Sequence, residues 1–159
     1  MSESSRGSAL RGSDPLALPA SLFSALIEIA DDAVVVIDDA QCILLFNRGA
    51  ERMFGYSASE VVGESLTLLM PDGAGERHAA HVKDFGSQRP SARRMGDRAR
   101  ISGKRANGEF FAAEASISHV DVNGLRYYAA IVRDVSERQK YEEALAASEA
   151  RFRTLAESA

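Results

Sequence analysis

Apolar and polar residues recur with a period that changes along the chain, and each change predicts an element. Residues 1–18 show no periodic apolar positions and are rich in Ser, Gly and Pro, which predicts a disordered tail. Over residues 19–30 the apolar side chains recur at helical spacing, and Ser21 is a residue type that caps helices. This stretch is therefore predicted to be an N-terminal amphipathic helix capped by Ser21.

Two short runs of β-branched and apolar residues come next and predict a β-hairpin. The first, AVVVID (residues 33–38), leads into the turn composition DDAQ, and the second, CILLFN (residues 42–47), follows directly. Asn47 then has the side chain of an N-cap for a short helix, and Gly55 is a natural end for that helix. The pattern predicts two paired strands followed by a capped helix.

Further short segments are predicted before the next strands begin. Ser57 and Glu60 form a capping box that opens a brief helix. The leucines and the methionine within residues 66–70 are expected to be buried, and a longer helix is predicted over residues 76–85. A polar connection rich in Arg, Pro and Gly follows this helix.

The period returns to two from Arg98 onward. ARISGKR and EFFAAEASISHV flank the turn Ala106-Asn107-Gly108, and LRYYAAIVRDV follows a second turn that ends at Gly124. Two strands, several short helices and then three strands predict an α+β fold. We expect a five-stranded antiparallel sheet with the helices inserted between strands 2 and 3, enclosing a core where a ligand can sit.

Composition and charge narrow the classes of function. The chain has 159 residues, a formal net charge of −4 and one cysteine, Cys42. A negative net charge does not favour binding to the phosphate backbone of nucleic acid. A single cysteine excludes a disulfide within the chain. No apolar run approaches the roughly 18 residues of a membrane span, and no secretory signal is present. We therefore expect a cytoplasmic setting, with no nucleic-acid partner and no membrane contact by this stretch.

The last part of the chain, residues 137–159, predicts a helical connector. Its apolar seam has the 4, 3, 4, 3 spacing of a heptad repeat and consists of Tyr141, Leu145, Ser148, Phe152 and Leu155. The seam predicts a parallel coiled coil between two copies of the chain. The alternative is a surface helix that packs on its own domain.

Four segments in order resemble successive blocks of a PAS domain. They are FNRGAERMFGYSASEVVGES, LMP, KRANGEFFAAEASIS and YYAAIVRDVSERQ, and the resemblance spans about residues 20–140 with the domain itself at 31–136. It implies the PAS fold and a homodimer formed through the N-terminal helix, the connector or both. The segment RDVSERQ resembles the family's exit motif, which implies that Asp134 pairs with a basic residue, with Arg138 as a candidate partner. The resemblance implies a signal relay through Asp134, Arg138, Tyr141, Leu145 and Phe152.

The segment SEARFRTLAESA resembles the opening helix of another PAS domain. The chain is therefore expected to belong to a longer signalling protein, most often a histidine kinase or a cyclic-di-nucleotide enzyme, with the output domain in the same polypeptide. The chain itself carries no phosphoacceptor-histidine motif and no ATP-binding glycine boxes, so it is not expected to be an enzyme.

The segment LMPDGAGERHAAHV is similar to the haem-binding PAS domains of the FixL and DosP type. This resemblance implies haem b with His78 as the iron ligand, and His81 is the second candidate. Cofactor contacts are then expected from Met95, Arg98, Arg100 and Ile117. The position that matches the family's distal arginine is Ala99, which lies between two arginines, so the expected oxygen-stabilising donor is out of register. The alternative is that His78 is a solvated residue near a helix start.

Three functions stay open from the sequence. The first is a PAS sensor and dimerisation module, the second a haem-based gas or redox sensor, and the third a ligand-free protein–protein interaction domain. A photochemical flavin is disfavoured because the helix after the first hairpin lacks a cysteine. A redox flavin held without a covalent bond is disfavoured because the chain has no tryptophan, which some flavin-binding PAS domains place beside the ring.

Overall fold

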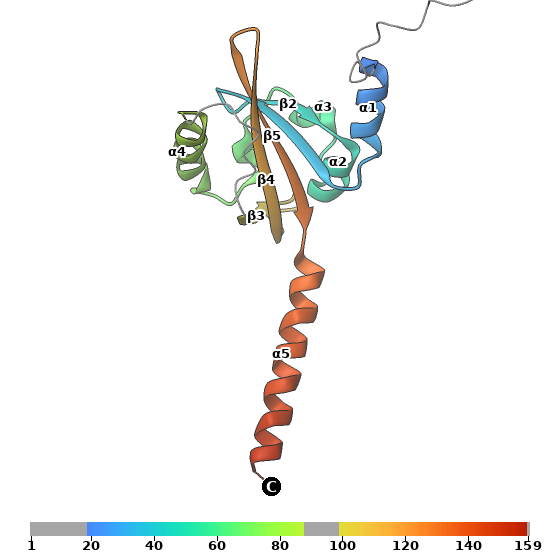
Figure 1. Cartoon of the computed structure of the whole chain (residues 1–159), viewed down its shortest axis with the longest axis vertical. Coiled ribbons are helices and arrows are strands. Elements are labelled where there is room, and N and C mark those ends of the chain that lie inside the picture. The colour runs from blue at the N-terminus through green and yellow to red at the C-terminus, as the bar shows by residue number, and fades with distance from the viewer. Residues whose placement is uncertain (1–18, 88–98, 159) are drawn as a thin grey trace, which may run out of the picture.

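The five strands form one antiparallel sheet in the order β2-β1-β5-β4-β3 (Figure 1). The computed structural model describes residues 19–87 and 99–158, so the predicted tail at residues 1–18 lies outside the described residues. The strands are β1 (Ala33–Asp38), β2 (Ile43–Phe46), β3 (Ala99–Lys104), β4 (Phe110–Val122) and β5 (Leu125–Asp134). This arrangement confirms the predicted α+β fold and its five-stranded sheet.

Four helices lie between β2 and β3 in the described residues, as predicted, and one helix lies on each side of the strand-containing region in the sequence. They are α1 (Ala20–Ile29), α2 (Arg48–Phe54), α3 (Ala58–Val61), the 3-10 helix η1 (Leu66–Leu69), α4 (Ala74–Ser87) and α5 (Ser136–Glu157). Among residues 19–87 and 99–158, none of the helices has the length and apolar composition needed to cross a membrane.

Side chains of alternate strand residues form the core, because successive residues of a strand point to opposite faces. Ala33, Val35 and Ile37 of β1 are buried, and so are Phe111 and the small residues of β4 on the same face. Three aromatic rings join the helices to this face. Phe54 lies 6.0 Å from Phe46 and 5.4 Å from Phe111, measured between ring centroids. Such aromatic pairs add about 0.5–1.5 kcal/mol beyond the area that they bury.

The predicted caps between residues 47 and 60 are confirmed. The Oδ1 atom of Asn47 accepts a hydrogen bond from the Ala50 amide at 2.9 Å, and Gly55 ends α2 in the left-handed region with a φ of 79°. Ser57 and Glu60 form the capping box of α3. These caps are local in sequence, and for that reason a single pattern of a few residues was enough to predict them.

The start of α1 and the orientation of Leu68 differ from the predictions. The prediction of Ser21 as the cap of α1 is wrong, because the helix begins at Ala20 and the carbonyl oxygen of Pro19 accepts hydrogen bonds from the amides of Leu22 and Phe23. Leu68 is exposed, since a 3-10 helix brings residues three apart onto one face and so turns Leu66 and Leu69 inward together. The helix predicted over residues 76–85 extends over Ala74–Ser87.

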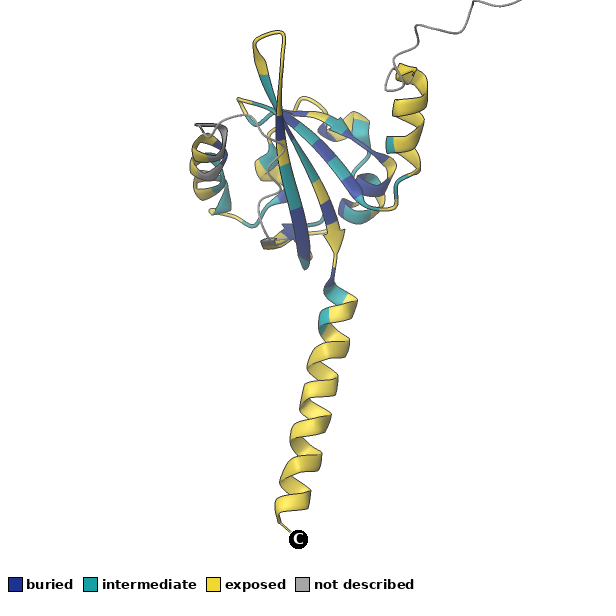
Figure 2. Ribbon diagram, viewed as in Figure 1, coloured by how far each residue is buried: buried dark blue, intermediate teal, exposed yellow. Residues whose placement is uncertain are grey.

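The long helix α5 leaves the domain and extends away from it (Figure 2). The amide of Val135 donates to the carbonyl oxygen of Ala112 at 3.0 Å, so the start of the helix is fixed to β4. None of the α5 residues that the structure describes is buried, and the side chains of its apolar seam are exposed by 62–77% of their surface. The alternative that this helix packs on its own domain is therefore wrong.

Candidate functional site

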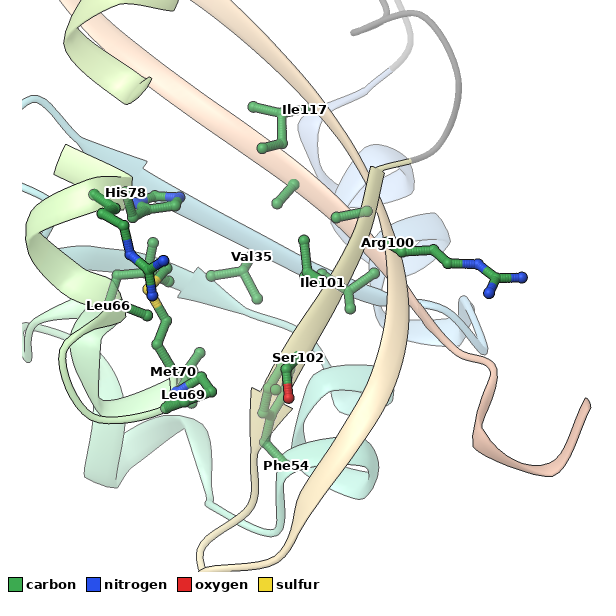
Figure 3. Close-up of a pocket in the computed structure, with 17 residues that line it drawn as sticks. Val35, Phe54, Leu66, Leu69, Met70, His78, Arg100, Ile101, Ser102 and Ile117 are labelled. Carbon is green, nitrogen blue, oxygen red and sulfur yellow. The ribbon is translucent and has the colours of Figure 1, made fainter. Parts of the chain in front are cut away.

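A cavity of about 450 Å³ lies between the inner face of the sheet and the segment from η1 to α4 (Figure 3). Most of its lining side chains are apolar; they include Val35, Phe54, Leu66, Leu69, Met70, Ile101, Ala115, Ile117, Ala130 and Val132. Two charged or titratable side chains of α4, Arg77 and His78, also line it. An apolar cavity of this size with few polar groups is typical of a small-molecule site.

His78 is half-buried on the α4 side of the cavity, and its ring has a defined partner. The Nδ1 atom lies 3.2 Å from Oε1 of Gln41, which is in the turn between β1 and β2. An amide oxygen only accepts hydrogen bonds, so this contact is made by the form of the ring that carries a proton on Nδ1. This is the tautomer that can bind a metal through Nε2.

Backbone contacts of Gln41 hold it beside His78. Gln41 has a φ of 62°, in the left-handed region that residues with a Cβ rarely adopt. Its amide donates to the carbonyl oxygen of Asp38 at 3.0 Å, and its own carbonyl oxygen accepts from the amide of Leu66 at 2.9 Å. The turn between β1 and β2 is thereby joined to η1, and the side chain of Gln41 is directed at α4.

The other predicted haem contacts are only partly brought together. Ile117 and Arg100 both line the cavity, but the guanidinium of Arg100 points away from it (Figure 3). Ala99 pairs with Ala115 and Arg100 with Glu114, so Arg100 faces opposite to its cavity-lining neighbour Ile101. Met95, Arg98 and the side chain of His81 lie outside the described residues.

A continuous series of side chains connects the cavity to the start of α5. Phe54 lines the cavity and meets Phe111 edge to face. The guanidinium carbon of Arg105 lies 4.0 Å from the centroid of the Phe111 ring, a cation–π contact. Arg105 also donates from Nη2 to Oδ2 of Asp134 at 2.7 Å and from Nη1 to the carbonyl oxygen of Met53.

Asp134 connects this series to the first turn of α5. Its second oxygen, Oδ1, accepts a hydrogen bond from the Ser136 amide at 2.9 Å. Partial burial raises the pKa of this carboxyl, but the hydrogen bonds from Arg105 and Ser136 outweigh burial and the net pKa lies below its ordinary value. Asp134 is thus held as a carboxylate between Arg105 and the helix.

Asp134 forms its ion pair with Arg105 and not with Arg138. Arg138 binds Glu114 of β4 at 2.5 Å and lies 3.5 Å from Glu142, one turn further along α5. Arg138 projects from α5 toward β4, while Asp134 faces the loop that carries Arg105. The other predicted relay residues, Tyr141, Leu145 and Phe152, are exposed along α5.

Two residues of the site were not singled out from the sequence. Arg105 lies in the block KRANGEFFAAEASIS, in which the pattern predicts only strands and a turn. Gln41 carried no signal at all, because its contact with His78 joins residues that are 37 positions apart. Such contacts depend on how the hairpin and α4 are placed in space, which no local pattern encodes.

Comparisons with known proteins agree with this geometry. A family model described as PAS domain matches residues 31–137. The chain is 31% identical over 115 residues to the sensor protein FixL of Bradyrhizobium diazoefficiens, which covers 72% of this chain and 23% of that protein. It is 27% identical over 116 residues to the oxygen sensor protein DosP of Escherichia coli, covering 69% of this chain and 14% of that protein. The chain thus spans less than a quarter of these curated relatives.

Solved structures show the same fold. The PAS domain of an HTR-like protein from Haloarcula marismortui has a TM-score of 0.61 at 24% identity, covering 72% of this chain and 89% of that one. An RNA-binding light-oxygen-voltage receptor has a TM-score of 0.64 at 25% identity, covering 91% of this chain and 41% of that one.

Proposed function

The chain belongs to the PAS domain family, and on that basis we propose that it is the sensor module of a larger signal-transduction protein. Domains of this family are sensor modules and not catalysts. An event in the cavity changes how α5 docks on the sheet, and α5 carries that change to an output domain in the same polypeptide. A histidine kinase or a cyclic-di-nucleotide enzyme is the expected output.

The observation that carries this proposal is the series of contacts from Phe54 to Ser136. Each step is a direct contact: ring on ring, guanidinium on ring, ion pair, and a carboxylate oxygen on a helix amide. A ligand that displaces Phe54 therefore alters the support of Arg105 and Asp134 under the first turn of α5. The response is a shift between two dockings of the helix, each favoured by one state of the cavity.

Arg105→Gln tests this connection, with the neighbouring Lys104→Gln as the matched control. Lys104 forms an exposed ion pair with Asp72 and lies outside the series. Loss of a partly exposed ion pair worth roughly 1 kcal/mol should raise amide hydrogen exchange in residues 137–143 about fivefold. Lys104→Gln should leave the same amides unchanged. Equal exchange in the two variants would contradict the proposed connection.

We also propose that the chain forms a homodimer, since PAS domains commonly dimerise. Two helices present exposed apolar side chains, Leu22, Phe23, Leu26 and Ile29 on α1 and the heptad seam on α5. Light scattering before and after truncation at Ser136 tests which helix forms the contact. The predicted result is a drop from dimer to monomer mass. An unchanged dimer mass would remove α5 as the main contact and leave α1, and a monomeric intact chain would contradict the dimer itself.

The arrangement around His78 favours a second function, haem-based gas or redox sensing, which we propose for this cavity. Gln41 sets the tautomer that leaves Nε2 of His78 able to bind iron, and the apolar lining suits a porphyrin. Arg77, beside His78, provides a cation for a propionate. FixL and the oxygen sensor DosP are relatives of this chain. Bound haem supplies an iron centre that takes up a diatomic gas or changes its redox state.

An absorption spectrum of the protein titrated with haemin tests this second function. We expect a Soret band that is lost in His78→Ala and restored when imidazole is added, because imidazole replaces the missing ligand. A spectrum that stays that of free haemin would exclude haem binding, and a ligand-free interaction domain would then become the alternative to a sensor of another ligand. A Soret band unchanged in His78→Ala would exclude His78 as the iron ligand.

A further inference from the structure

Four side chains of alternating charge form a row across the outer face of the sheet, from the α1–β1 connection to α5. We call Asp32, Arg133, Glu114 and Arg138 the charge row. Arg133 binds Asp32 through two hydrogen bonds, Nε to Oδ1 at 3.0 Å and Nη2 to Oδ2 at 2.7 Å. Arg133 is directly opposite Glu114 in the pairing of β4 and β5, and Glu114 binds Arg138. The row runs from the α1–β1 connection across β5 and β4 to α5.

The middle of the charge row is its most buried part. The Glu114 side chain is only 10% exposed, whereas those of Arg133 and Arg138 are about half exposed at 50% and 49%. A nearly buried carboxylate requires cationic partners. Glu114 forms an ion pair with Arg138 and lies opposite Arg133 of β5 and Arg100 of β3 in the sheet register. The pKa of the Arg133 guanidinium is raised, chiefly by its hydrogen bonds with Asp32 and with a further contribution from the charge of Glu114.

The first member of the charge row is tied to α1 through the backbone. The Nδ2 atom of Asn47 donates to the carbonyl oxygen of Ile27 at 2.8 Å and to that of Asp32 at 3.2 Å. The backbone of Gly49 packs closely against the backbone of Asp32, because a Cβ atom at Gly49 would lie 2.4 Å from the Asp32 carbonyl oxygen. The last turn of α1 and the backbone of Asp32 are therefore held by one side chain.

We propose that the charge row couples α1 directly to α5, so that a displacement of α1 changes the docking of α5 with no change in the cavity. The coupling needs neither Arg105 nor Asp134, and it does not depend on any ligand. The module therefore has a second input, a displacement of α1, and this input acts on the same first turn of α5 as the cavity does. The partly exposed outer pairs make this coupling sensitive to ionic strength.

Amide hydrogen exchange in residues 137–143 tests the coupling, with Asp32→Asn as the variant and Asp31→Asn as the matched control. Asp31 is a fully exposed neighbour that contacts Arg52 and is not in the charge row. We expect exchange of the α5 amides to rise about threefold in Asp32→Asn, the effect of one exposed ion pair, and to stay unchanged in Asp31→Asn. In 0.5 M salt the difference between the two variants should shrink.

A double substitution separates coupling from general destabilisation. In an Arg138→Gln background the row is already interrupted, so Asp32→Asn should add nothing to the exchange of the α5 amides. An equal effect of Asp32→Asn in both backgrounds would overturn the proposal, and so would an equal rise in the amides of β4 and β5. The effect of Asp32→Asn should persist in Arg105→Gln, so failure of the cavity connection and failure of the charge row give different results.

Discussion

Asn47 uses every hydrogen-bonding atom of its side chain inside the core. Its Oδ1 atom accepts from the amides of Val34 and Ala50, and its Nδ2 atom donates to the carbonyl oxygens of Ile27 and Asp32. Asn47 and its partner Ala50 are fully buried, and Val34, Ile27 and Asp32 are half-buried. One side chain thus joins the end of α1, the strand β1 and the start of α2.

Asn47→Leu should strongly destabilise the domain. It leaves the buried amide of Ala50 and three half-buried backbone groups without partners, and each such group costs about 1–3 kcal/mol, so we expect a loss of at least roughly 3 kcal/mol in the free energy of unfolding. Asn107→Ala is the control, because Asn107 is an exposed turn residue that accepts one hydrogen bond, from Glu109. Urea unfolding of both variants measures the difference. A loss below about 1 kcal/mol for Asn47→Leu would contradict this role.

The contact between Gln41 and Nδ1 of His78 fixes the orientation of a ring that would otherwise be solvated. If haem binds as proposed, Gln41→Leu should weaken its affinity by about 10- to 100-fold, the usual effect of removing the hydrogen-bond partner of a metal-binding histidine. Haemin titration measures this, and Gln139→Leu on α5 is the control. Unchanged affinity would mean that Gln41 does not orient the ring.

Residue-level predictions from the sequence succeeded where the cause is local. Asn47, Gly55 and the pair Ser57–Glu60 act within one helical turn, so their roles follow from residue type and spacing. The partner of Asp134 did not follow in this way. Arg138 is close in sequence, but the pairing depends on the direction in which α5 leaves the sheet, and that direction brings Arg138 to Glu114.

At the scale of elements, the first turn of α5 is held by few interactions. Beyond the backbone hydrogen bond of Val135, they include the carboxylate of Asp134, a 3.4 Å hydrogen bond from the Ser136 hydroxyl to the carbonyl oxygen of Ala112, and the ion pair of Arg138 with Glu114. The rest of the helix has no buried side chain in the described structure. A small change at these contacts therefore has a large effect on how the helix docks, which is what a signal-transmitting element requires.

Acid should loosen this turn through Asp134. Its folded-state pKa lies below its ordinary value of about 3.9, so its stabilising contribution is present above that pH and is lost as the pH falls through the folded-state pKa. Amide exchange in residues 137–143, measured between about pH 5 and pH 2.5 and corrected for intrinsic rates, should show extra loosening in the native chain. Asp134→Asn should remove this component, and an identical pH profile in the two proteins would contradict it.

The periodicity of the sequence predicted the elements better than their roles. Strand alternation and the turn signals at Gly108 and Gly124 defined the sheet, because burial of one face imposes a period of two. The boundaries of α4 were underestimated, since polar and apolar residues mix in this helix. Charge pairs between strands, such as Arg133 with Glu114, leave no periodic signal and emerged only from the register.

At the scale of the whole molecule, two connections end on the start of α5. One comes from the cavity through Arg105 and Asp134, and the other comes from α1 through the charge row. They share no side chain, yet both act on the same helical turn. A sensor built in this way can combine an event inside its cavity with one that arrives along the chain.

The central claim is that a change in the cavity alters how α5 docks on the sheet. A substitution that fills the cavity with a larger side chain tests this claim without a known ligand. Ala130 lines the cavity, while its neighbour Ala129 lies on the opposite face of β5, so Ala130→Leu and Ala129→Leu form a matched pair. The measurement is amide hydrogen exchange in residues 137–143 relative to the sheet amides. We predict a change of about threefold or more in Ala130→Leu that disappears when Arg105→Gln is added, and none in Ala129→Leu. Unchanged α5 exchange in Ala130→Leu, with the sheet amides altered, would contradict the account.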